Sequence, residues 1–118
     1  MKDVPTEGKL TLMRVYVGES DTWQGKPLSG ALVDLMRHEG MNGISVLRGG
    51  GSPPSEGRSQ ENHATNLLLL SQELPVVVEV VETEERIEKL LSRIGEMIPA
   101  GRVITLERAL LILCPSHG

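Results

Sequence analysis

Aromatic side chains are almost missing from this sequence. Tyr16 and Trp23 are the whole aromatic content of 118 residues, and phenylalanine is absent. Proteins that bind single-stranded nucleic acids stack the bases on several exposed rings, which this chain lacks. Sixteen acidic residues outnumber twelve basic ones, so the net charge of -4 leaves no dominant surface for a polyanion. We therefore expect no nucleic-acid partner.

Cysteine and long apolar runs are also scarce. A single cysteine, Cys114, can form no intramolecular disulfide, and no Cys-x-x-Cys pair is present to bind zinc. The polar N-terminal stretch MKDVPTEGKL contains Pro5 and is unlike a secretion signal. No apolar run approaches the roughly 18–20 residues that a membrane helix needs. These absences predict a cytoplasmic location.

The sequence does contain strand-like and helix-like segments in a regular order. Strand-forming residues fill four segments, which are 9–17, 43–48, 76–81 and 103–113. Apolar residues recur at the helical period in two others, 27–40 and 83–98, with Pro27 at the first helical position and Thr83 as an N-cap. This order predicts an α+β, ferredoxin-like βαββαβ sandwich, an antiparallel four-stranded sheet with two helices on one face. We expect a flexible leader at 1–8, the domain at 9–113 and a tail at 114–118.

Two of the predicted strands are apolar on both faces. In 10–17 and in 76–81, the residues that point to either side of the sheet are mostly apolar. Two helices cover only one face of a sheet, and a bare apolar face is too large a patch for a soluble monomer. The sequence therefore predicts an obligate homo-oligomer.

Enzymatic motifs are missing. The sequence holds no G-x-S-x-G, no P-loop and no H-E-x-x-H. Acylphosphatases share the predicted fold and need an Arg and an Asn near the loop after the first strand, but the stretch 18–27 contains neither. His38, His63 and His117 show no local pairing that would indicate a metal site. We expect no enzymatic activity and no metal centre from these residues.

The stretch 49–66 is the most unusual part of the chain. Its single apolar side chain is Ala64, so it has almost nothing to bury, and we predict a long mobile loop. It opens with Gly49, Gly50 and Gly51, directly after Arg48. Consecutive glycines let backbone N–H groups converge on an anion, and Arg48 or Arg58 would supply charge. The alternative is a slack connector without a ligand.

A second glycine–arginine turn, Gly101-Arg102, lies between the second helix and the last strand. It could hold an anion in the same way. The alternative is a helix stop followed by a solvated arginine.

Four segments resemble the PII-like proteins catalogued as domain-of-unknown-function family 190. They are LMRVYVGESDTWQGKPL (12–28), GISVLRGGG (43–51), LPVVVEVVETEERIEKLL (74–91) and GRVITLE (101–107). The wider superfamily comprises the PII nitrogen-regulatory proteins, which are ferredoxin-like homotrimers. They bind adenine nucleotides in clefts between subunits and grip target proteins, often transporters, with a long loop after the second strand. Relatives of this branch are often encoded beside fluoride-channel genes.

The resemblance assigns roles by position. Gly49–Gly51 match the glycines at the base of the PII loop, residues 52–63 match the target-gripping loop, and Gly101-Arg102 match a second phosphate-holding turn. The match is incomplete, because no Lys or Tyr occurs between 49 and 66 and the final strand lacks the PII arginines.

The resemblance implies a trimeric signalling protein. We expect it to bind a small anionic effector, an adenine nucleotide, between subunits and to regulate a partner such as a membrane transporter or channel. The predicted ligand-binding residues are Arg48, Gly49, Gly50, Gly51, Arg58, Gly101 and Arg102. Two alternatives stay open: a divalent-metal-binding trimer resembling the cation-tolerance proteins, and a purely structural trimer.

Overall fold

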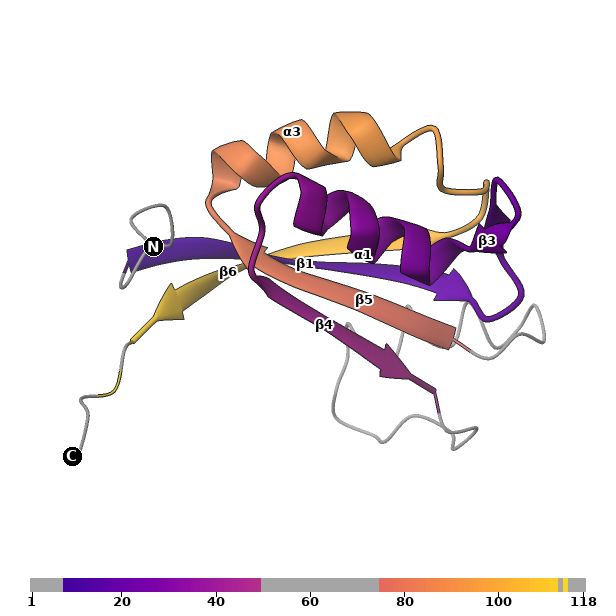
Figure 1. The fold of residues 1–118 in the computed structure, drawn as a ribbon. Helices are drawn as coiled ribbons and strands as arrows, with labels where there is room; N and C mark the ends of the chain where they lie inside the picture. Colours follow the sequence, from indigo (N-terminus) through magenta and orange to yellow (C-terminus); the bar gives the residue numbers. More distant parts are fainter. Residues whose placement is uncertain (1–7, 50–74, 113, 115–118) are drawn as a thin grey trace.

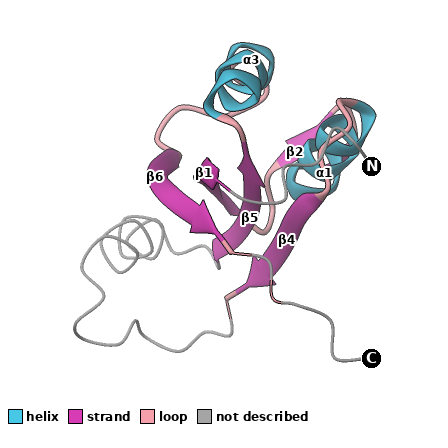
Figure 2. Cartoon of the chain, turned by 90° about the vertical axis from the view of Figure 1, so that its left-hand side faces the viewer, coloured by secondary structure: helices cyan, strands magenta, loops and turns pink. Residues whose placement is uncertain are grey.

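Four strands form one antiparallel sheet in the order β4-β5-β1-β6 (Figure 1). The computed structural model describes residues 8–49, 75–112 and 114. In it the strands are β1 (Gly8–Gly18), β4 (Gly43–Arg48), β5 (Pro75–Glu82) and β6 (Val103–Leu111). Helices α1 (Leu28–His38) and α3 (Glu84–Ile94) lie on the same side of the sheet (Figure 2). The ferredoxin-like α+β sandwich predicted from the sequence is confirmed.

The core lies between the helices and one face of the sheet. Strand register places Met13 opposite Val80, Val15 opposite Val78 and Val17 opposite Val76, all six facing the helices. The helices contribute a matching set of side chains with no more than 1% exposure: Leu28, Leu32, Met36, Ile87, Leu90 and Ile94. The apolar side chains that recur at the helical period and those that alternate along the strands therefore pack together in a single apolar layer.

A small hairpin follows β1, where the sequence predicted only a connection. Its strands are β2 (Thr22–Trp23) and β3 (Lys26–Pro27). The two residues between them, Gln24 and Gly25, have φ angles of 52° and 82°. Positive φ at both positions is what a two-residue hairpin loop of type I′ requires. Pro27 then precedes α1 with φ -56° and ψ 133°, so our placement of Pro27 as the first helical residue is wrong by one position.

The helix ends follow local chemistry. Gly40, with φ +83°, comes two residues after the last residue of α1, in the left-handed conformation typical of a helix C-terminus. The predicted cap of α3 is confirmed, because the Thr83 hydroxyl accepts a hydrogen bond from the backbone N–H of Arg86 at 3.4 Å. The predicted helix extended to residue 98, but α3 ends at Ile94. The N–H groups of Met97 and Ile98 both donate to the Ile94 carbonyl, so a turn keeps their side chains on the core.

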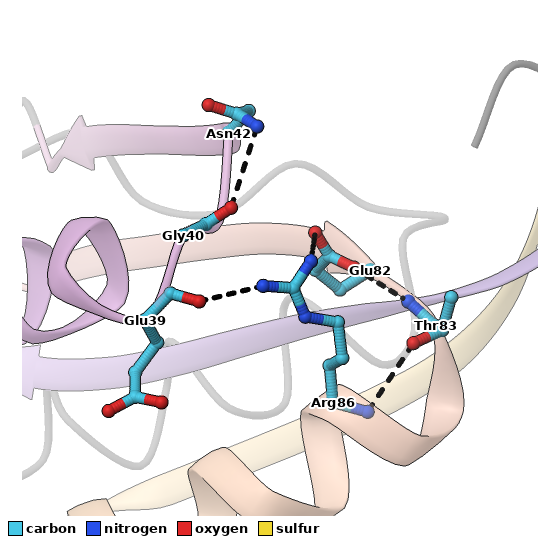
Figure 3. A network of polar contacts seen from close by, with 6 residues as sticks. All are labelled: Glu39, Gly40, Asn42, Glu82, Thr83 and Arg86. Carbon is cyan, nitrogen blue, oxygen red and sulfur yellow. Dashed lines mark hydrogen bonds and ion pairs between the residues drawn. The ribbon is translucent and has the colours of Figure 1, made fainter. Parts of the chain in front are cut away.

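A polar network ties α3 to the turn after α1 (Figure 3). The Arg86 guanidinium donates to the Glu39 carbonyl at 2.7 Å and pairs with the Glu82 carboxylate at 3.3 Å. Glu82 is only 3% exposed, and it also accepts from the N–H of Thr83 at 3.1 Å. Arg86 therefore neutralises a buried charge and satisfies a free carbonyl at the end of α1.

Neither helix lies against the opposite face of the sheet (Figure 2). This face carries a small apolar cluster of Tyr16, Val77 and Val103. Beside the cluster, the Arg14 guanidinium donates to Glu79 at 2.8 Å and also pairs with Glu107. An arginine between two carboxylates therefore interrupts a face that the sequence predicted to be mainly apolar.

Candidate functional site

The predicted ligand-binding residues within the described ranges gather at one end of the sheet. Arg48 is the last residue of β4 and lies opposite Val76, the second residue of β5. Gly101 and Arg102 directly precede β6, whose first residue lies opposite Tyr16, near the end of β1. Gly50, Gly51 and Arg58, together with the predicted mobile loop beyond Gly49, lie outside the described residues.

The two halves of this candidate site are well separated within one chain. Strands β5 and β1 lie between β4 and β6. Because neighbouring strands are spaced about 4.8 Å apart, β4 and β6 are about 14 Å apart. One phosphate group cannot bridge that distance. A single ligand would have to be elongated, or each half would have to act with another chain.

Gly49 has a packing role that the sequence did not indicate. Its N–H donates to the Pro75 carbonyl at 2.8 Å. A Cβ atom at residue 49 would lie 2.8 Å from both Cδ and Cγ of Pro75 and 3.0 Å from its carbonyl oxygen. Glycine is therefore required at 49 by the close approach of β5, and its N–H is already used by the fold.

Arg48 faces a hollow between α1 and β4. The hollow has a volume of about 510 Å³ and is lined by Ser29, Gly30, Val33, Asp34, Val46 and Arg48. Arg48 is exposed, and within residues 8–49 and 75–112 no carboxylate lies within ion-pair distance of it. Its charge is available to a ligand.

Arg102, in contrast, is held by Asp21. Its Nε and Nη2 donate to the two carboxylate oxygens of Asp21, each at 2.7 Å. The two side chains are only 13% and 9% exposed, so the solvated arginine that the sequence left open is not what the structure shows. This bidentate geometry is the strongest form of an arginine–carboxylate contact.

Asp21 is the centre of a larger arrangement. Its carboxylate also accepts the Gly18 N–H at 2.8 Å, and its backbone carbonyl accepts the Leu28 N–H at 2.9 Å. The hydrogen bonds from Arg102 lower the pKa of Asp21 below its usual value; burial opposes this, while the Gly18 N–H and the charge of Arg102 add to it. Asp21 thus joins the end of β1, the start of α1 and the turn before β6.

Sequence reasoning did not identify Asp21 as a functional or structural residue. It belongs to the segment 12–28, one of the four that carried the family resemblance, but no role was given to it. An aspartate three residues after a strand-terminal glycine favours a side-chain bond to the backbone. That local signal could have indicated the contact with Gly18, but not the partner 81 residues away.

Metal ligands do not cluster in the part of the chain that the structure describes. There, no group of three or more His, Cys, Asp or Glu side chains could hold an ion. His38 is exposed in the last turn of α1, while His63 and His117 lie outside the described residues. Neither described helix has the length and apolar character to cross a bilayer.

Comparisons with known proteins agree on one family. A family model, DUF190, described as "Uncharacterized ACR, COG1993", matches residues 10–110. A "UPF0166 protein" of Aquifex aeolicus is 31% identical over 86 residues, which cover 73% of this chain and 79% of that protein. A UPF0166 protein of Methanocaldococcus jannaschii is 26% identical over 98 residues, covering 83% and 87% of the two chains. A further UPF0166 protein of Aquifex aeolicus is 31% identical over 100 residues, covering 85% and 94%.

Proposed function

Because the chain belongs to the DUF190 family, we propose that it is a PII-like regulatory protein and not an enzyme. In this proposal it is a cytoplasmic homotrimer that binds an adenine nucleotide between subunits. The bound nucleotide changes how the segment 49–66 fits a partner protein, such as a membrane transporter or channel.

One observation supports the proposal most. Residues far apart in the sequence, Arg48 and Gly101–Arg102, lie at the same end of the sheet. Gly49, which precedes the segment 50–74, and Pro75, which follows it, lie at that end as well. A ligand bound at this end is therefore placed to act on that segment directly.

The strand order supports a site shared between subunits. Strand β4 and the turn before β6 are about 14 Å apart within one chain, too far to hold the same phosphate. In a ring of identical chains, the β4 end of one subunit can lie beside the β6 end of its neighbour. Heterologous contacts of this kind close into a cyclic trimer when the rotation is right.

The sheet face opposite the helices is the surface we expect the trimer to use. It combines the Tyr16 cluster with the Arg14–Glu79–Glu107 ion pairs. Apolar side chains would supply the free energy of association, and the charged groups would fix the orientation of the subunits.

The test combines assembly with ligand binding. Sedimentation velocity should give a trimer at micromolar concentration, and calorimetry should show binding of AMP, ADP or ATP. Arg48→Met should weaken binding by about tenfold to a hundredfold, the equivalent of one charge-assisted hydrogen bond. Arg37→Met is the matched control, because Arg37 is an exposed arginine in the last turn of α1, away from this end of the sheet.

Three results would contradict the proposal. They are a stable monomer, no nucleotide binding below millimolar concentration, and equal losses of affinity in the Arg48 and Arg37 variants. A rise in unfolding temperature with Cu²⁺ or Zn²⁺, and none with nucleotides, would favour the divalent-metal alternative.

A further inference from the structure

We propose that the hollow between the start of α1 and the end of β4 binds the phosphoryl group of a phosphate monoester. The groups that hold it are the Ser29 hydroxyl, the first-turn N–H groups of α1 and the Arg48 guanidinium. This inference deepens the proposed function, on which it rests for the identity of the monoester as a nucleotide.

The N-terminus of α1 has no anionic or side-chain cap of its own. The N-cap residue is Pro27, which makes no side-chain hydrogen bond, and the first turn holds no acidic residue. The Leu28 N–H donates to Asp21, whereas the N–H groups of Ser29 and Gly30 have no partner among the described residues. Free N–H groups and the positive end of the helix dipole favour an anion at this position.

Helix α3 offers the contrast within the same chain. Its N-terminus carries the Thr83 cap together with Glu84 and Glu85 in the first turn. The two helices have the same length, 11 residues. The N-terminus of α3 thus has a side-chain cap and acidic residues in its own sequence. The N-terminus of α1 has neither, and it lies beside Arg48.

Ser29 provides an independent sign of a ligand. The residue is only 6% exposed, yet its hydroxyl makes no hydrogen bond within the described part of the chain. Among the described residues, every side-chain oxygen or nitrogen that is sealed from solvent has a hydrogen-bond partner. The Ser29 hydroxyl has none, so it is not sealed, and the open space that Ser29 lines is this hollow. The hydroxyl thus has no partner in the described ranges and is open to the hollow, where a phosphate oxygen would accept its hydrogen bond.

The charges around the hollow fix how a ligand would lie. Among the residues that line the hollow, Arg48 carries the positive charge and Asp34 carries the negative charge. Asp34 lies one turn beyond Gly30 on α1, so its charge directs the phosphoryl group toward Ser29 and Arg48. The valines Val33 and Val46 form an apolar wall between α1 and β4 for the organic part of the ligand. The lining thus suits a monoester better than free phosphate.

Gly30 makes a decisive variant possible. A Cβ atom added at this exposed residue would meet no atom within 4 Å, so a side chain fits without disturbing the fold. Glutamate in the first turn of a helix is favourable, and replacing a helical glycine removes its entropic cost. Gly30→Glu should therefore raise the unfolding temperature while it places a negative charge at the mouth of the hollow.

The experiment measures binding of AMP, phenyl phosphate and adenosine by calorimetry. We expect AMP and phenyl phosphate to bind and adenosine to bind at least tenfold more weakly. Ser29→Ala should weaken AMP binding by about tenfold, and Gly30→Glu should abolish it without loss of stability. Ser92→Glu, on the exposed face of α3, adds the same charge elsewhere and should leave binding unchanged.

The outcomes separate the two proposals. If AMP binds the wild type and the Ser29 and Gly30 variants equally, the hollow is not the site, while the proposed function stands. If phenyl phosphate binds and is lost in Gly30→Glu, but no nucleotide binds, the phosphoryl site stands and the proposed function fails. If neither phosphate ester binds at millimolar concentration, both are wrong.

Discussion

Replacing Arg102 with methionine should destabilise the fold, because it leaves the Asp21 carboxylate without its bidentate partner. Methionine keeps the apolar stem of the side chain and removes only the guanidinium. Removing one partner of a buried ion pair costs about 3–5 kcal/mol. Asp21 is 9% exposed and keeps its hydrogen bond from Gly18, so we expect a loss near the lower end, about 3 kcal/mol.

The assay is urea unfolding followed by far-UV circular dichroism at fixed protein concentration. A double-mutant cycle with Asp21→Asn and the double variant gives the coupling energy, since asparagine can still accept the Gly18 N–H. The matched control is Arg93→Met. Arg93 pairs with Glu39 at 2.7 Å but is 55% exposed, so its loss should cost no more than about 1 kcal/mol. Equal effects at Arg102 and Arg93, or no measurable coupling to Asp21, would refute the reasoning.

The same pair predicts a pH dependence. Folding lowers the pKa of Asp21, so the unfolded chain binds a proton at this site more readily than the folded one. The stabilisation is complete above the ordinary aspartate pKa and is lost as the pH falls through the lower folded value. The free-energy difference between wild type and Arg102→Met should therefore shrink between about pH 5 and pH 2. A difference that stays constant over this range would contradict the assignment to Asp21.

Two further substitutions test the packing. Gly49→Ala should destabilise the fold by about 1–3 kcal/mol, because the new Cβ would lie 2.8 Å from the Pro75 ring; a thermal unfolding curve that overlays the wild type would contradict this. Arg86→Met should cost about 3 kcal/mol, since it strips the buried Glu82 of its partner and the Glu39 carbonyl of its donor. Hydrogen exchange at the end of α1 should rise in that variant, and unchanged exchange would count against the contact to Glu39.

The elements of the fold were predictable because each has a local pattern. The helical spacing from Leu28 to Met36 and the strand-forming run from Val76 to Val81 became α1 and β5. The hairpin of β2 and β3 was missed, since two-residue strands leave no periodicity to detect.

The site was predictable only in outline. Residue types indicated that Arg48 and Arg102 carry charge near glycine-rich turns, and the structure places both at one end of the sheet. The ion pair between Asp21 and Arg102 joins residues 81 apart, and no local pattern encodes such a contact. Gly49 was interpreted as part of an anion loop, whereas its nearest neighbour is Pro75, which only the pairing of β4 with β5 reveals.

The hydrogen bond between Gly49 and Pro75 has a consequence for engineering. It fixes the two ends of the segment 50–74 next to each other, independently of what lies between them. The entropy of closing a chain segment grows only slowly with its length, by about 0.6 kcal/mol per doubling. The domain should therefore accept a longer, shorter or foreign segment at this junction with little change in unfolding temperature. Grafting 50–74 from a relative should then leave the host domain folded, which gives a direct test of whether this segment selects the partner proposed above.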